Sequence, residues 1–220
     1  MPITQAGRRR GRPPAGGSSA HREVVLDATF ELLVERGYQG TTMAGVAERA
    51  GSSKETLYAW FGSKQGLFTA LIRRQAEAAN QAVAAALDGD GAGSDPAATL
   101  TAFATNLLRL LLGERSVALN RAAIADLGGR EPGGELAAVL LAQGRHRTGP
   151  VVEDYLARLA AAGHLRIDDP AEAFRLLYGL VIQDLQIRVL LGEPPPRPGA
   201  LATQARVAVE RFLVLTATPN

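Results

Sequence analysis

Basic side chains that could bind a polyanion are the groups in this sequence best suited to chemistry. The chain's two lysines, Lys54 and Lys64, both lie in residues 41–68. Residues 1–75 carry 11 Lys and Arg against 6 Asp and Glu, whereas residues 76–220 carry 13 against 16. The excess of basic residues therefore lies in the same part of the chain as residues 41–68, where nucleic acid would bind. A composition that favours arginine could also have left two lysines here by chance, and the sequence leaves both interpretations open.

Catalytic side chains do not converge in the sequence. The three histidines, His21, His146 and His164, lie on separate segments, and His146 stands between two arginines. The sequence has no H-E-x-x-H helix, nucleophile elbow or phosphate-binding glycine loop. It has no cysteine, so neither a disulfide nor a thiolate metal site can form. We therefore expect no enzyme activity, no cofactor and no metal site.

Two short helices around a tight turn would position the lysines. Apolar residues recur at helical spacing over residues 43–50 and predict the first helix, which Gly51 ends. The second helix, residues 54–61, follows a pair of capping serines and turns Leu57 and Phe61 inward. Its outward residues are Lys54, Thr56, Tyr58 and Trp60. This is a helix-turn-helix arrangement, whose second helix is narrow enough to enter a DNA major groove.

The same stretch resembles the signature of the TetR family of bacterial transcriptional regulators, G-x-[ST]-x-x-T-L-Y-x-[WY]-F-x-[ST]-K-x-x-L-F. The matching residues are Gly51, Ser53, Thr56, Leu57, Tyr58, Trp60, Phe61, Ser63, Lys64, Leu67 and Phe68. The close match covers residues 21–80, and the spacing of the second half is similar to AefR-like C-terminal domains. The resemblance implies an all-α fold, in which a three-helix helix-turn-helix DNA-binding domain precedes a helical ligand-binding and dimerisation domain. It also implies phosphate contacts from Thr42, Ser53, Tyr58, Trp60 and Lys64, and base contacts from Lys54 and Thr56.

Residues 1–19 contain Arg, Gly, Pro and Ser with almost no apolar side chain, which predicts a disordered basic arm. The RGRP sequence at residues 10–13 matches the core of an AT-hook, which lays arginines along the A·T minor groove. Candidate DNA contacts in the arm are Arg8, Arg9, Arg10 and Arg12. A solvated tail that only aids solubility is the alternative.

Targeting and membrane signals are weak in the sequence. The arginine run at residues 8–10 could begin a twin-arginine export signal, but Gly, Pro, Ala and Ser follow it instead of an apolar segment. No apolar run approaches the roughly 18–20 residues that a membrane span needs. We therefore expect a cytoplasmic protein with no membrane partner.

The remaining pattern predicts helices and no strand. We expect nine helices, over residues 23–36, 43–50, 54–61, 63–87, 96–112, 114–127, 132–163, 171–191 and 201–215. Gly37 would end the first of these, and Gly149-Pro150 would kink or break the longest. We divide the chain into the arm, a DNA-binding domain over residues 20–80, and an effector-binding and dimerisation domain over residues 81–216.

The last two long helices are candidates for a dimer interface. Residues 171–191 are apolar nearly all round, and residues 201–215 more mildly so, which predicts burial on several sides. In the TetR family these helices pack against their mates as a four-helix interface, and paired DNA-reading heads need two-fold symmetry. The candidate interface residues are Leu180, Ile187, Val209 and Phe212. A larger core within one chain is the alternative.

A few polar or aromatic groups in apolar helices are typical of a small-molecule pocket. The candidates are Phe103, Asn106, Leu107, Asn120, Tyr155, Tyr178 and Gln183. Each one alone could equally be a core or surface residue. We expect a homodimeric repressor that binds double-stranded operator DNA and is released by a small-molecule effector. The alternatives are a regulator that has no ligand or is controlled by a partner protein, and a helical carrier or enzyme with a vestigial DNA-binding fold.

Overall fold

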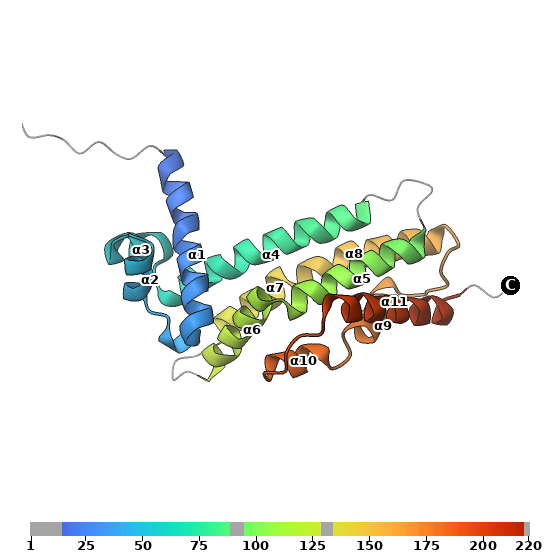
Figure 1. Cartoon of the computed structure of the whole chain (residues 1–220). Helices are drawn as coiled ribbons and strands as arrows, with labels where there is room; N and C mark the ends of the chain where they lie inside the picture. The colour runs from blue at the N-terminus through green and yellow to red at the C-terminus, as the bar shows by residue number, and fades with distance from the viewer. Residues whose placement is uncertain (1–14, 89–94, 129–133, 218–220) are drawn as a thin grey trace, which may run out of the picture.

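The computed structural model describes residues 15–88, 95–128 and 134–217. Within these residues the chain forms eleven helices and no strand, which confirms the expected all-α fold. The helices are α1 (Ala15–Gly40), α2 (Met43–Arg49), α3 (Lys54–Phe61), α4 (Lys64–Asp88), α5 (Pro96–Leu112), α6 (Glu114–Leu127), α7 (Glu135–Gln143), α8 (Arg145–Ala161), α9 (Pro170–Ile182), α10 (Leu185–Leu190) and α11 (Pro198–Leu215). Figure 1 shows α1–α3 gathered at one end, with α4 leading from them into an elongated group of helices. We call α1–α3 the head and α4–α11 the bundle.

Two of the expected helices are each divided, which raises their number above the nine predicted from sequence. The segment 132–163 breaks at Gly144, where φ is −92° and ψ is −103°, and not at Gly149-Pro150. Pro150 lies inside α8 instead. The segment 171–191 breaks at Gln183, which has a positive φ of 47° that residues other than glycine rarely adopt.

A contact from α11 explains the break at Gln183. The side-chain nitrogen Nε2 of Gln204 donates to the carbonyl oxygens of Leu180 and Val181, each at 3.3 Å. These carbonyls belong to the last turn of α9, where the helix itself supplies no partner. The break is therefore stabilised by a residue of a later helix, which the local sequence pattern does not reveal.

The first helix begins at Ala15, earlier than the expected residue 23. Residues 15–19, which we expected in the disordered arm, are therefore helical, and the rest of the arm lies outside the described residues. Gly37 ends the regular part of α1 as expected, because its φ of 67° is readily adopted by glycine. Ser63 caps α4 as expected, accepting a hydrogen bond from the backbone nitrogen of Gly66 at 3.0 Å.

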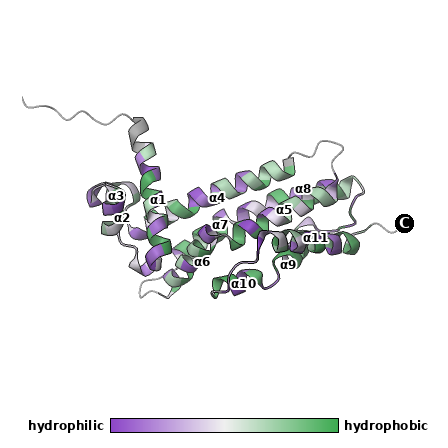
Figure 2. Ribbon diagram, viewed as in Figure 1, coloured by the Kyte–Doolittle hydropathy of each residue, from purple (hydrophilic) through white to green (hydrophobic). Residues whose placement is uncertain are grey.

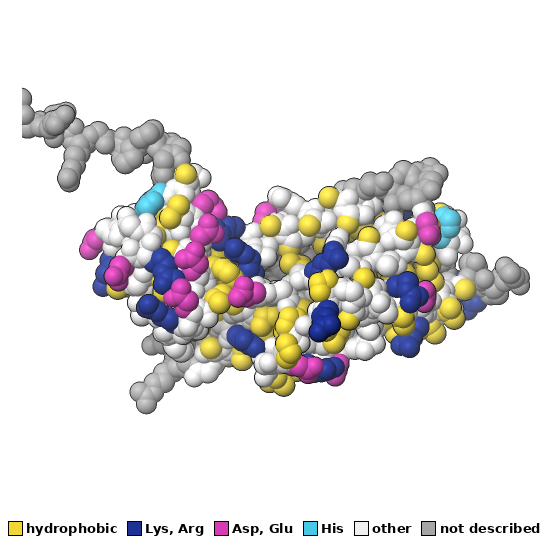
Figure 3. Space-filling model, in the orientation of Figure 1, with side chains coloured by type: hydrophobic (Ala, Val, Ile, Leu, Met, Phe, Trp, Pro, Cys, Tyr) yellow, Lys and Arg dark blue, Asp and Glu magenta, His cyan; other side chains and the backbone are white. Residues whose placement is uncertain are grey.

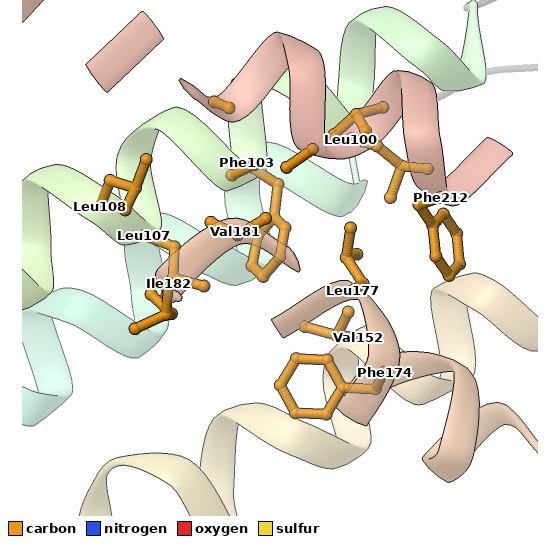
Figure 4. Packing of buried hydrophobic residues seen from close by; sticks show 14 of the residues in the cluster. Leu100, Phe103, Leu107, Leu108, Val152, Phe174, Leu177, Val181, Ile182 and Phe212 are labelled. Atoms are coloured by element: carbon orange, nitrogen blue, oxygen red, sulfur yellow. The ribbon is translucent and has the colours of Figure 1, made fainter. Parts of the chain in front are cut away.

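The core of the bundle is built mainly from α5, α8, α9 and α11 (Figure 4), with smaller contributions from α4, α6 and α10. Phe103 of α5, Leu177 of α9 and Phe212 of α11 are each at most 1% exposed and lie together in this core. Because α11 packs against both α5 and α9, its apolar stripe points into the subunit. Val209 and Phe212 are therefore core residues of one chain, and the expectation that they lie in a dimer interface is wrong.

The core of the head continues into the bundle. Leu57 of α3 lies in the same cluster of buried side chains as Leu119 of α6 and Leu136 of α7. Helix α4 contributes Phe68 to this cluster and Leu87 to the core of the bundle. Helix α4 is therefore packed at both of its ends and connects the two cores.

The helices expose a mixture of residue types. Figure 2 shows hydrophobic and hydrophilic residues alternating along most of them, the pattern of helices that bury one face and expose the other. None of the described helices combines the length and apolar character needed to cross a membrane.

We expect Leu57→Ala to lower the free energy of unfolding by about 2–5 kcal/mol, because Leu57 is fully buried and its truncation leaves a cavity. Lys54→Ala, on the exposed face of the same helix, should change it by no more than about 0.5 kcal/mol. Urea denaturation followed by circular dichroism measures both quantities. Equal effects of the two substitutions would show that the inner face of α3 does not support the head.

Candidate functional site

Helix α3 presents a polar face to solvent. Ser53 caps its first turn by accepting a hydrogen bond from the backbone nitrogen of Thr56 at 3.1 Å. Leu57 is buried and fixes the inner face of the helix. On the outer face Lys54 and Tyr58 are both exposed, and the exposed fraction of Tyr58 is 49%. Both residues are therefore accessible to another molecule.

Hydroxyl groups that we expected to meet DNA also cap the two short helices. Thr42 Oγ1 accepts a hydrogen bond from the backbone nitrogen of Gly45 at 3.1 Å and caps α2. Ser53 Oγ lies 3.0 Å from Thr56 Oγ1, so these two hydroxyls are hydrogen-bonded to each other. A hydroxyl that accepts one hydrogen bond still has its own hydrogen to donate. Capping of α2 by Thr42 is therefore compatible with a contact to a phosphate oxygen.

Trp60 is half-buried, so only part of its side chain faces outward. Its ring makes an edge contact with His21, with 5.7 Å between the ring centres. Arg22 donates a hydrogen bond to the carbonyl oxygen of Trp60 at 3.3 Å, and its guanidinium lies 4.7 Å from the centre of the Phe61 ring. These contacts hold the end of α3 against α1, so Trp60 helps to position the helix.

Lys64 is half-buried and directed toward the end of α1. Its ammonium donates a hydrogen bond to the carbonyl oxygen of Tyr38 and lies 4.2 Å from the centre of the Tyr38 ring. Burial lowers the pKa of Lys64, and the charge of Asp126 opposes part of that effect. The phosphate contact expected from sequence would require this side chain to leave the Tyr38 carbonyl.

The buried carboxylate of Asp126 joins the head to the bundle. Tyr38, in the last turn of α1, donates a hydrogen bond to Asp126 Oδ1 at 3.0 Å. Gln65 of α4 donates to the same oxygen at 3.4 Å, and the backbone nitrogen of Leu136 in α7 donates to Oδ2 at 3.5 Å. Burial raises the pKa of Tyr38, and the hydrogen bond to Asp126 raises it further. We call these four residues, together with Lys64, the Asp126 junction.

The Asp126 junction was not predicted from the sequence. Asp126 is an acidic residue near the carboxyl end of α6, where a negative charge opposes the helix dipole. A residue that contradicts its local preference in this way indicates a stabilising contact elsewhere in the fold. That mismatch is the signal by which the residue could have been found.

A cavity of about 280 Å³ between the helices of the bundle is a second candidate site. Its lining residues come from α4 to α10, with Gly144 between α7 and α8. Of the seven residues expected to bind an effector, Asn120 and Tyr178 line this cavity. The structure thus brings together two expected residues from α6 and α9.

The other five expected effector-binding residues lie elsewhere. Phe103, Leu107 and Tyr155 are buried in the core of the bundle. Asn106 is exposed on α5, and Gln183 is exposed at the break between α9 and α10. These five residues therefore do not line the cavity to which Asn120 and Tyr178 belong. Helical periodicity separates buried from exposed faces, but it does not separate a packed core from the wall of a cavity.

Ion pairs offset much of the charge on the head. Figure 3 shows acidic side chains following α1 with basic side chains beside them. Arg49 donates a hydrogen bond to Glu35 at 2.7 Å, and Arg74 pairs with Glu23 at 3.0 Å. Residues 15–75, which comprise the head and the first half of α4, carry 7 Lys and Arg against 6 Asp and Glu. The basic excess of the amino-terminal part therefore comes mainly from the four arginines of residues 1–14.

Two family models match this chain. Residues 25–71 match the model of bacterial regulatory proteins of the tetR family. Residues 98–215 match the AefR-like transcriptional repressor C-terminal domain. The first match contains all of α2 and α3, and the second contains Asp126 and most residues that line the cavity.

Similar proteins of comparable length share the fold. The TetR transcriptional regulator from Agrobacterium tumefaciens superposes with a TM-score of 0.72 at 38% identity, covering 90% of this chain and 95% of that one. The Flavonoid-responsive Regulator FrrA gives a TM-score of 0.67 at 29% identity, covering 92% and 100%. The HTH-type transcriptional repressor Rv1474c of Mycobacterium tuberculosis is 27% identical over 88% of this chain and 95% of its own length. Five further curated regulators are 37–46% identical over shorter stretches, and the alignment with this chain spans only 25–38% of their length.

We expect Asp126→Asn to lower the free energy of unfolding by about 1–3 kcal/mol, because it disturbs hydrogen bonds to a buried charged acceptor. When Asp126→Asn is combined with Tyr38→Phe, the free energy of unfolding should fall by less than the sum of the two single losses. We expect a difference of about 0.5–3 kcal/mol, since the two residues share a hydrogen bond. Urea denaturation of the four proteins measures this difference. Thr203→Ala, on the exposed side of α11, is the control. Its change in the free energy of unfolding should simply add to that of Asp126→Asn. Strict additivity of the Tyr38 and Asp126 losses would contradict a shared hydrogen bond.

Proposed function

The chain belongs to the TetR family of bacterial transcriptional regulators, and we propose that it is a homodimeric repressor that a small molecule releases from operator DNA. Proteins of this family are regulators and not enzymes. The outer face of α3 carries the proposal, because the buried Leu57 holds Lys54 and Tyr58 toward solvent. In this proposal residues 20–80 bind DNA, and residues 81–216 bind the effector and the second subunit.

In the proposed complex α3 enters the major groove. Lys54 and Thr56 read base edges, because they stand at the amino end of the helix, the part of a recognition helix that meets bases. The residues that fix the head on phosphates are Thr42, Ser53, Tyr58, Trp60 and Lys64. Of these, Lys64 must first exchange the Tyr38 carbonyl for a phosphate oxygen.

The amino-terminal arm supplies most of the positive charge in this proposal. Residues 15–61, which form the head, hold 4 basic and 6 acidic side chains, so the head alone has no excess of positive charge to attract DNA. Each phosphate neutralised by a basic group adds to affinity through the release of counterions. The proposed phosphate and minor-groove contacts of the arm are Arg8, Arg9, Arg10 and Arg12.

A dimer would place two heads about one helical turn of DNA apart, ~34–36 Å, so that both meet the major groove. Apolar side chains on α9, α10 and α11 that are not fully buried offer a surface for the second subunit: Leu176, Leu180, Ile187, Val214 and Leu215. Leu180, Val214 and Leu215 line one hollow, which supports a continuous contact. We therefore propose this surface as the interface. It contains Leu180 and Ile187, two of the interface residues predicted from sequence.

A small-molecule effector is supported by the cavity and by one similar protein. FrrA is named as flavonoid-responsive and covers 92% of this chain. Helices α4 and α6 both line the cavity and both carry residues of the Asp126 junction. A ligand that binds better to a conformation with wider-set heads would shift the population toward it and lower operator affinity. The proposed cavity residues include Asn120 and Tyr178.

We expect Tyr58→Ala to weaken operator binding by about 1–3 kcal/mol, as loss of a close contact would. Because Tyr58 is 49% exposed, the substitution should leave the free energy of unfolding nearly unchanged. Fluorescence anisotropy of labelled DNA measures the affinity, and Tyr58→Phe separates the contribution of the hydroxyl from that of the ring. An unchanged affinity for Tyr58→Ala would remove this residue from the interface.

A gel shift with the DNA upstream of the protein's own gene tests the proposed function. We expect a complex that survives an excess of unrelated DNA, since specific sites typically bind about 10³–10⁷ times more tightly than non-specific DNA. The control is a fragment of the same length and composition with its sequence shuffled. Equal binding of the upstream and shuffled fragments would contradict recognition of an operator in this region.

A further inference from the structure

The side chains around the cavity point to the chemical class of its ligand. We propose that the effector is a compact apolar molecule with one anionic group, such as a carboxylate, and that Arg145 binds this group. The inference rests on the proposed role of the cavity as the effector site, and it adds the charge and size of the effector to that proposal.

Most of the cavity wall is aliphatic. Ile72 and Ala76 of α4, Leu110 of α5 and Leu119 of α6 are among its lining residues. Its volume of about 280 Å³ lies just below the ~300–1,000 Å³ that is usual for small-molecule sites. The apolar part of the ligand must therefore be compact.

Arg145 is the one charged side chain among the described residues that line the cavity. Its guanidinium lies 4.4 Å from the centre of the Tyr178 ring and 5.7 Å from that of Phe174. No carboxylate among the described residues lies within ion-pair distance of Arg145. Arg147, two residues further along α8, pairs with Glu77 at 2.9 Å. The positive charge at the cavity therefore has no internal counter-charge within this part of the chain.

Tyr178 and the amino end of α8 add to the attraction for an anion. Burial raises the pKa of Tyr178, although the neighbouring Arg145 opposes part of this effect. The phenol is therefore protonated at neutral pH and has a hydrogen to donate. Gly144 and Arg145 also bring the amino end of a 17-residue helix to the cavity wall, where the helix dipole favours negative charge.

A guanidinium in a mostly aliphatic wall discriminates among ligands of one size. Arg145 is exposed, so a neutral ligand would leave its guanidinium in water and gain no charge-assisted hydrogen bond from it. An amine would add repulsion between like charges. A carboxylate can form two parallel, charge-assisted hydrogen bonds with the guanidinium. The anion is therefore the class that this wall favours.

Isothermal titration calorimetry of the full chain with octanoate, 1-octanol and octylamine tests the ligand class, because the three compounds share one apolar frame. We expect octanoate to bind at least about tenfold more tightly than 1-octanol, and octylamine not to bind. Arg145→Gln should reduce the affinity for octanoate to the level of the affinity for 1-octanol. Arg145→Lys, which keeps the charge, and Arg147→Gln, which removes a neighbouring charge, should both preserve the preference. Equal affinities for octanoate and 1-octanol, no binding of octanoate, or an unchanged preference in Arg145→Gln would overturn the proposal.

A parallel titration of the protein–operator complex with the same compounds separates this inference from the proposed function. Arg145-dependent binding of octanoate without release of DNA would support the ligand class and contradict control by an effector. Release of DNA by 1-octanol as efficiently as by octanoate would support effector control and contradict the ligand class.

Discussion

The buried carboxylate of Asp126 is the constraint that relates the position of the head to the bundle. A buried charge is tolerated only when hydrogen bonds satisfy it, and here the donors are Tyr38, Gln65 and the backbone nitrogen of Leu136. These donors belong to α1, α4 and α7, whereas Asp126 belongs to α6. The head therefore cannot rotate against α6 without breaking one of these hydrogen bonds or carrying neighbouring helices with it.

Two helices connect this junction to the cavity. Gln65 and Ala76 of α4 lie roughly 17 Å apart along the helix, and Asn120 and Asp126 of α6 lie roughly 9 Å apart, at ~1.5 Å per residue. A hydrogen bond to a charged group contributes about 1.5–3 kcal/mol, and allosteric coupling is typically about 1–3 kcal/mol. In our proposal, the loss of one hydrogen bond at the junction is therefore large enough to account for release of DNA by a ligand.

The sequence predicts the elements whose causes are local. Caps, glycines and helical periodicity placed α3, α5 and α6 at their observed bounds, and the TetR resemblance is confirmed by the matches over residues 25–71 and 98–215. The direction of Lys64, the break at Gln183 and the burial of Phe212 depend instead on contacts with helices distant in sequence. An apolar stripe predicts that a face is buried, but it does not identify what covers it. For this reason the sequence could not separate a dimer interface from a core, or a core from a cavity wall.

The affinity of a cavity ligand with and without bound operator tests the coupling between the cavity and α3 most directly. Octanoate would be titrated into the free protein and into the protein saturated with operator DNA. Because allosteric coupling is reciprocal, we predict that operator DNA weakens octanoate binding by the same factor, about 5–150-fold, by which octanoate weakens operator binding. Asp126→Asn should reduce this factor. An octanoate affinity that is the same in the presence and absence of operator would contradict the account.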